Sequence, residues 1–77
     1  MSGQISISVE VDEDQAASYL AWLFSQYETA MAGFWFDDRY RYTPQGFRAK
    51  RIVADHPHMV GLVRTMRALR LQLGAKA

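Results

Sequence analysis

Hydrophobic and polar residues alternate strictly between Gln4 and Val11, which is the period of a strand that buries one face. Polar side chains would line one side of this strand. The other side would carry four branched apolar residues: Ile5, Ile7, Val9 and Val11. We therefore predict a strand over residues 4–11.

A helix is predicted to follow over residues 13–32. Asp12 and Gln15 have the spacing of a capping box, and two further acids lie in the first turn, where the helix dipole favours negative charge. Apolar residues then recur every three or four positions, and Gly33 is the expected terminator. Trp22 falls on the opposite, polar side of this helix, so we expect it to be exposed.

Residues 34–53 have the pattern of a β-hairpin. Aromatic side chains alternate with polar and charged ones up to Tyr42, and the TPQG stretch over residues 43–46 is typical of a turn. In the simplest register Tyr42 faces Phe47 on the inner side and Arg51 also lies inside, whereas a glycine bulge would exchange the two sides. The outer face would carry one tryptophan and four cations: Trp35, Arg39, Arg41, Arg48 and Lys50.

The last predicted element is a helix over residues 57–73. Asp55 or His56 would cap it, Pro57 suits its first turn, and Gly74 would end it. One stripe at spacings of three and four residues would face the core: Met59, Leu62, Met66, Leu69 and Leu73. The far side would carry two arginines, Arg64 and Arg67.

The resulting order, β-α-β-β-α, predicts an α+β fold in a single domain over residues 1–77. Two helices would cover one face of a three-stranded antiparallel or mixed sheet and form a two-layer sandwich. The core of such a short chain is small. A symmetric homodimer is therefore one expected way of enlarging it.

Charge is divided sharply along the chain. Residues 1–38 hold seven acids and no Lys or Arg, whereas residues 39–77 hold nine bases and one acid, so the formal charges of −7 and +8 give the overall +1. Such a division indicates either an interaction surface or two halves that meet inside one fold.

The cellular compartment is predicted from features that the sequence lacks. There is no cysteine, and the first residues have neither the basic nor the apolar region of a signal peptide. No apolar run approaches the roughly 20 residues that a membrane helix needs. These features predict a cytoplasmic protein without a membrane partner.

The residues for most kinds of catalysis are missing from their usual patterns. No serine lies in a Gly-x-Ser-x-Gly turn, and no glycine-rich phosphate loop is present. Asp37 and Asp38 are adjacent, so in a strand their side chains would diverge, which is poor geometry for acid–base work. We therefore expect no enzyme and no cofactor.

Asp55, His56 and His58 are the best candidates for metal ligands. Two histidines and an aspartate are suitable donors, but such a short group at a helix start is more typical of a cap and a turn. We assign no metal site, and a metal-dependent protein using His56 and His58 is the weakest of three functional hypotheses.

The first hypothesis is a non-enzymatic protein that docks on another protein, as an inhibitor or adaptor does. Arginine and tryptophan are enriched at interface centres. Small cysteine-free proteins of this kind include phage-encoded inhibitors such as anti-CRISPR proteins, a likeness of size and composition alone. The expected binding surface comprises Trp22, Trp35, Arg39, Arg41, Arg48, Lys50, Arg64 and Arg67.

Nucleic acid is the alternative partner, bound by the basic hairpin of residues 39–51. Basic residues interleaved with aromatic ones are typical of such surfaces. Two observations weigh against it. The hairpin register turns Tyr40, Tyr42 and Phe47 inward, and the sequence pI of about 8.1 is low for this class.

Overall fold

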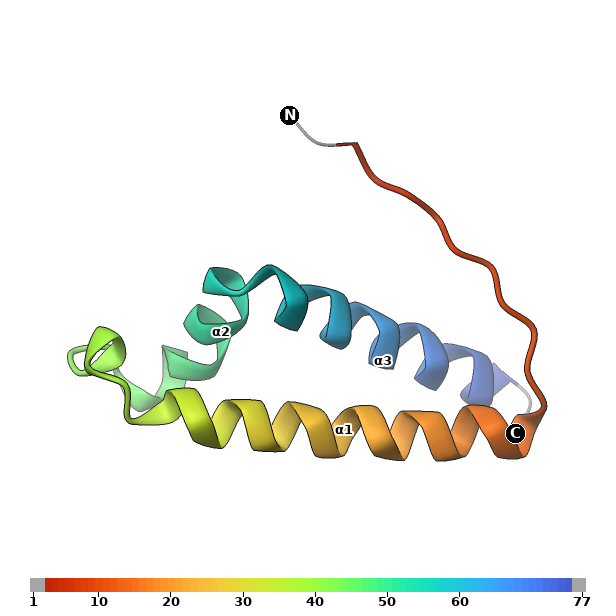
Figure 1. Ribbon diagram of the computed structural model, residues 1–77, viewed down its shortest axis with the longest axis horizontal. Coiled ribbons are helices and arrows are strands. Elements are labelled where there is room, and N and C mark those ends of the chain that lie inside the picture. The colour runs from red at the N-terminus through yellow and green to blue at the C-terminus, as the bar shows by residue number, and fades with distance from the viewer. Residues whose placement is uncertain (1–2, 76–77) are drawn as a thin grey trace.

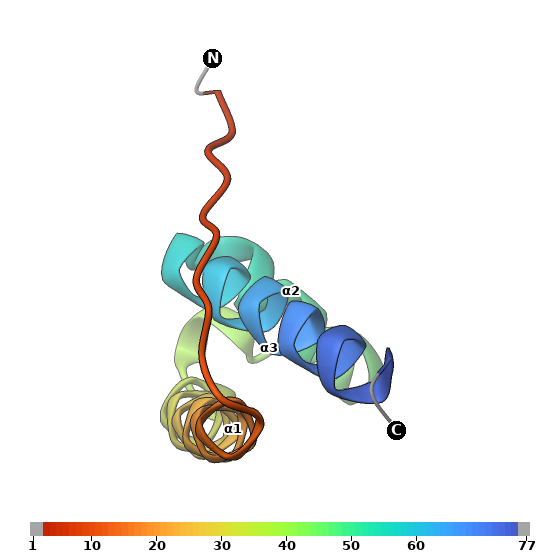
Figure 2. The same ribbon diagram turned by 90° about the vertical axis from the view of Figure 1, so that its right-hand side faces the viewer.

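The computed structural model describes residues 3–75, and it consists of helices and an extended N-terminal segment. The helices are α1 (Glu13–Trp35), a short 3₁₀ helix η1 (Asp38–Tyr40), α2 (Gln45–Asp55) and α3 (Pro57–Ala75). α3 runs back along α1, and α2 forms the connection at one end of the molecule (Figure 1). The end-on view shows that α1 and α3 cross at an angle (Figure 2).

No strand or sheet is present among residues 3–75, so the predicted α+β sandwich is wrong. Residues 4–11 are extended, but they pair with nothing, because the hairpin that should have supplied the neighbouring strands does not form. A single strand has no ladder of hydrogen bonds and no covered face.

The predicted hairpin of residues 34–53 is replaced by the last turn of α1, by η1 and by most of α2. The physical reason lies in the spacing of Ala49, Ile52 and Val53, which repeats at three and four residues and so favours a helix. Pro44, predicted as a turn residue, is instead the N-cap of α2.

The predicted helix starts are confirmed, and both predicted ends are too early. The backbone N–H of Asp12 donates to Oε1 of Gln15 at 3.0 Å, which closes the capping box, and Pro57 opens α3. α1 continues through Gly33, whose φ is not positive, and it ends at Trp35. The side chain of Phe34 stacks on the ring of His56, with 4.0 Å between the ring centroids, and this packing holds the additional turn.

The buried core lies between the helices. Within the described chain its members come from all four helical elements: Ala16 and Leu23 from α1, Tyr40 from η1, Ile52 from α2, and Met59 and Met66 from α3. The core is small. The radius of gyration of 14.7 Å exceeds the roughly 11 Å of a compact domain of this length, and the extended N-terminal segment contributes to this value. Removing one core side chain should therefore weaken the whole fold.

Truncation of Ile52 tests this core. Its side chain is fully buried, so Ile52→Ala should lower the free energy of unfolding by about 2–5 kcal/mol and Ile52→Val by about 1 kcal/mol. Leu71→Ala, at a residue that is 70% exposed, should change it by less than about 0.5 kcal/mol. Urea unfolding followed by circular dichroism measures all three. Equal losses of unfolding free energy for Ile52→Ala and Leu71→Ala would contradict the assignment of Ile52 to the core.

Candidate functional site

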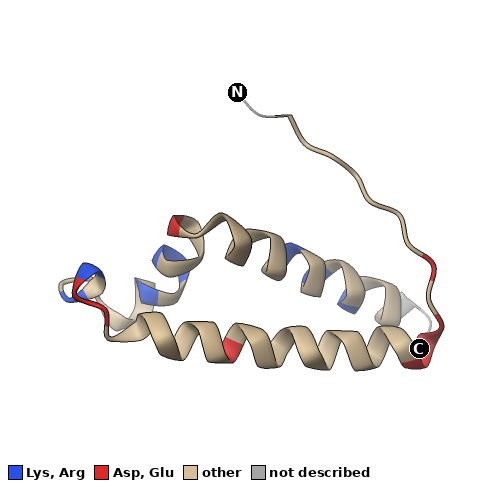
Figure 3. Cartoon of the chain, viewed as in Figure 1, with Lys and Arg blue, Asp and Glu red and all other residues tan. Residues whose placement is uncertain are grey.

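The segment of residues 36–51, here called the corner, exposes more aromatic surface than its surroundings. It begins directly after α1 and contains η1, the turn that follows it and the first part of α2. The exposed fractions of its three outward rings are 85% for Phe36, 89% for Tyr42 and 67% for Phe47. Four exposed cations lie in the same segment: Arg39, Arg41, Lys50 and Arg51. Figure 3 shows these basic positions on η1, the following turn and α2, with two acids just before them.

The helical conformation of α2 explains why its residues face outward. Positions three and four apart share a face of a helix, so Phe47, Lys50 and Arg51 lie together on the solvent side of α2. Ile52 lies on the other side and is completely buried. In the turn before α2, the guanidinium of Arg41 lies 5.8 Å from the centre of the Tyr42 ring, within cation–π range.

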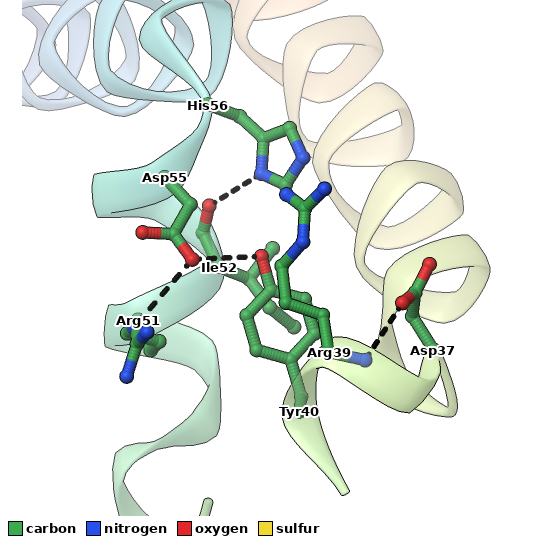
Figure 4. Close-up of polar contacts among 7 residues, drawn as sticks. All are labelled: Asp37, Arg39, Tyr40, Arg51, Ile52, Asp55 and His56. Carbon is green, nitrogen blue, oxygen red and sulfur yellow. Dashed lines mark hydrogen bonds and ion pairs between the residues drawn. The ribbon is translucent and has the colours of Figure 1, made fainter.

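The ring of Tyr40 anchors the corner to the body of the protein. It is 1% exposed, and its Oη donates a hydrogen bond to Oδ2 of Asp55 at 3.1 Å (Figure 4). The same Asp55 oxygen accepts from Nε of Arg51 at 3.3 Å. At the start of η1, the Asp37 side chain accepts from the backbone N–H of Arg39 at 2.9 Å. These contacts join η1 to the end of α2.

Burial raises the pKa of Tyr40 above its ordinary value of 10.0. The hydrogen bond to Asp55 and the negative charge of that carboxylate raise the pKa further, and Arg39 opposes them. The neutral phenol is therefore the form that fits this site.

Arg48 of α2 connects the turn before α2 to the end of α1. Its Nη1 donates to the carbonyl of Trp35 at 3.2 Å and its Nη2 to the carbonyl of Thr43 at 2.9 Å. Its guanidinium also lies 5.3 Å from the centre of the Trp35 ring, while its Nε is buried without a hydrogen-bond partner among the described residues. Arg48 was expected on an outer sheet face, but it is half-buried and holds the backbone of the corner in place.

The other residues of the expected binding surface do not form one patch. Trp22 is 54% exposed, as predicted, and it stacks on Tyr19 of α1 with 5.9 Å between the rings. Arg64 and Arg67 are exposed on α3. Trp35 is half-buried beneath Arg48, where it also lines a shallow hollow of about 220 Å³ on α1. Arg39, Arg41 and Lys50 are the expected residues that the corner does expose.

The histidines are used in packing. Nδ1 of His56 lies 2.8 Å from the carbonyl oxygen of Ile52, and the ring packs between Phe34 and His58. Asp55 is engaged by Tyr40 and Arg51. Throughout residues 3–75, no group of three or more His, Cys, Asp or Glu side chains is placed to hold a metal ion.

Sequence reasoning missed Phe36, Tyr42, Phe47 and Arg51 as surface residues. The assumed strand period turned Tyr42, Phe47 and Arg51 inward, and Phe36 shared their predicted side. The helical spacing of the residues between 49 and 53 is the signal that would have placed Phe47 and Arg51 outside. No such signal exists for Phe36 and Tyr42, because they lie in turns.

Three comparisons with known proteins gave no match, whether to protein-family models, to curated proteins or to solved structures. Within residues 3–75, no helix combines the length and apolar character that a membrane crossing requires.

The effect of pH on stability tests the buried phenol. The pKa of Tyr40 is raised in the folded protein, so above pH 10 the phenol ionises more readily in the unfolded chain than in the folded one. The stability that the buried neutral phenol contributes is therefore complete below pH 10 and is lost as the pH rises from there through the pKa of the folded state. Tyr40→Phe lacks the ionisation and the hydrogen bond, and should be less stable by about 1 kcal/mol at neutral pH. Unfolding measured from about pH 8 to pH 11 should show the wild type losing its advantage over Tyr40→Phe. A difference in unfolding free energy between the wild type and Tyr40→Phe that stays constant over this pH range would contradict the burial of a neutral Tyr40 phenol.

Replacement of Arg48 by Lys tests the tie within the corner. Lysine keeps the charge but cannot reach two carbonyls with a planar fork, so Arg48→Lys should lower the free energy of unfolding by about 1–3 kcal/mol. The matched change Arg67→Lys, at an exposed residue of α3, should be nearly neutral. Denaturant unfolding compares the two, and equal effects would show that Arg48 does not tie the corner.

Proposed function

We propose that this chain is a non-enzymatic protein that docks on an acidic surface of another protein through the corner. The observation that carries the proposal is the exposure of Phe36, Tyr42 and Phe47 in a segment with four exposed cations, of which Arg51 is ion-paired with Asp55. Exposed aromatic rings and arginines supply most of the binding energy at protein interfaces, because they combine large contact area with directed hydrogen bonds.

The charge of the corner favours an acidic partner. Residues 36–51 contain five bases and two acids, a formal charge of +3. Among the described residues, the structure has one ion pair, between Arg51 and Asp55 at 3.3 Å. The acidic and basic halves of the chain are therefore mostly not paired with each other inside the fold. The exposed cations of the corner can attract a negatively charged partner and speed its association.

The position and rigidity of the corner favour a partner with a concave site. Figure 1 shows the corner at one end of the long axis, where it projects beyond the packed helices. Tyr40 and Arg48 fix its backbone from inside, so the exposed rings are presented in an ordered arrangement. Such preorganisation lowers the entropy cost of binding.

Single-stranded nucleic acid is the second candidate, and one observation favours it. Tyr42 and Phe47 are exposed, whereas the hairpin register had turned them inward, so they are free to stack on bases beside Arg41 and Lys50. Asp37 and Asp38 lie in the same segment and would repel a phosphate backbone. For this reason we place the acidic protein first.

The experiment uses the immobilised full chain to capture proteins from a lysate of its source cells, with quantification by mass spectrometry. Tyr42→Ala/Phe47→Ala is the test variant, and Leu71→Ala, an equally exposed apolar position on α3, is the control. Captured acidic proteins are purified and titrated. One aromatic anchor is worth about 2 kcal/mol, or about 30-fold in affinity, so the double variant should bind between about 30-fold and about 700-fold more weakly.

The control should bind like the wild type, and circular dichroism verifies that both variants fold. If every purified partner binds the double variant as tightly as the wild type, docking through the corner is wrong. A labelled single-stranded oligonucleotide is titrated in parallel. If it binds with strong salt dependence and the double variant abolishes this, nucleic acid replaces protein as the partner.

A further inference from the structure

The N-terminal segment of residues 3–11, here called the tail, leaves the start of α1 and touches little else. Figure 1 shows it running clear of the helices. Its tip and Arg64 of α3 border an open space of about 720 Å³. The four apolar residues of its alternating pattern have exposed fractions of 86%, 81%, 72% and 53%: Ile5, Ile7, Val9 and Val11.

The backbone of the tail is equally unpartnered. The hydrogen bonds near the chain start begin at Asp12, so the N–H and C=O groups of residues 3–11 have no hydrogen-bond partner within residues 3–75. An extended segment with a row of free backbone groups and one apolar face is a template for pairing with another strand. Within residues 3–75 no segment forms a strand, so the described part of the chain has no sheet edge with which the tail could pair.

We propose that the tails of two copies of this chain pair as an antiparallel ribbon with two-fold symmetry about Ser8. This inference is independent of the function proposed for the corner. In the ribbon, Ser8 lies opposite Ser8 of the second copy, Ile7 opposite Val9, and Ile5 opposite Val11. Side chains that lie opposite one another share a face, so all eight apolar side chains gather on one side.

The register about Ser8 follows from the sequence. Symmetry about Ile7 would pair Val11 with Gly3 and leave one apolar residue of each copy without an apolar neighbour. On the polar face, symmetry about Ser8 places Glu10 opposite Ser6 and Asp12 opposite Gln4. No acid lies opposite an acid, so the ribbon avoids the like-charge pairs that destabilise sheets.

The size of a stable interface implies that the helices also contribute. A standard interface buries roughly 800 Å² on each partner, from 20–30 residues, which exceeds one eight-residue strand. The exposed stacked rings of Tyr19 and Trp22 lie on α1, the helix that follows the tail. Trp22 lies about 15 Å along α1 from Asp12, and Ile7 lies about 16 Å along the tail from the same residue. A bend at Asp12 that folds the tail along α1 would therefore bring Ile7 level with Trp22.

Single cysteines test the register directly, because the natural chain has none. In the proposed ribbon, the Cα atoms of the two residues 8 are about 4.5–5.5 Å apart, which suits a disulfide. Residue 6 of each copy is displaced by four positions, about 13 Å, and cannot reach its counterpart. Ser8→Cys should therefore form disulfide-linked dimers at least ten times faster than Ser6→Cys, the matched control on the same face.

Equal rates of disulfide formation at positions 6 and 8 would overturn the ribbon, and faster reaction of Ile7→Cys would overturn the register. Light scattering should find the wild type at twice the 8.8 kDa of one chain. Ile7→Lys should return it to the monomer, whereas Ser6→Lys, opposite Glu10, should leave it a dimer. A monomeric wild type at all concentrations, or a dimer unaffected by Ile7→Lys, would refute the proposal.

Discussion

The burial of the Tyr40 ring is the constraint on which the arrangement at the corner depends. Tyr40 is one of the largest fully buried side chains, and its hydroxyl is satisfied by Asp55 of α2. With this ring inside, η1 must lie against the helices. The short segment between η1 and α2 must then turn back over the surface. Arg48 fixes that return because it binds one carbonyl in the segment, that of Thr43, and one at the end of α1, that of Trp35.

The same constraint produces the exposed surface. In the two residues after Tyr40 the chain leaves the core, so Arg41 and Tyr42 are directed to solvent. α2 begins immediately afterwards, and its period sends Ile52 inward and Phe47, Lys50 and Arg51 outward. A small core is thus sufficient to direct these aromatic and basic side chains to solvent. The chain gains no stability from exposing these rings, which is the physical reason for assigning them a partner.

The sequence predicted the elements whose signals are local and failed where two periods compete. Asp12 with Gln15, and Pro57, correctly marked the starts of α1 and α3, because caps act within one turn. Residues 34–53 contain aromatics that fit a strand and the set Ala49, Ile52 and Val53 that fits a helix. Their conformation is decided by contacts with α1 and α3, such as Phe34 on His56, which no short pattern reports. Of the candidate site, Arg39, Arg41 and Lys50 were predicted as surface residues, while the exposure of Tyr42 and Phe47 depended on the fold that was missed.

Backbone chemical shifts and amide exchange of residues 34–55, measured by NMR spectroscopy in solution, test the helical corner most directly. The account predicts helical Cα shifts from Gln45 to Asp55 and slow exchange of the amides around Ile52, with Tyr42 outside regular structure. Strand-like shifts, with cross-strand proton contacts between residues 34–42 and 47–53, would restore the hairpin. Tyr42 and Phe47 would then turn inward, and the surface proposed to bind a partner would no longer exist.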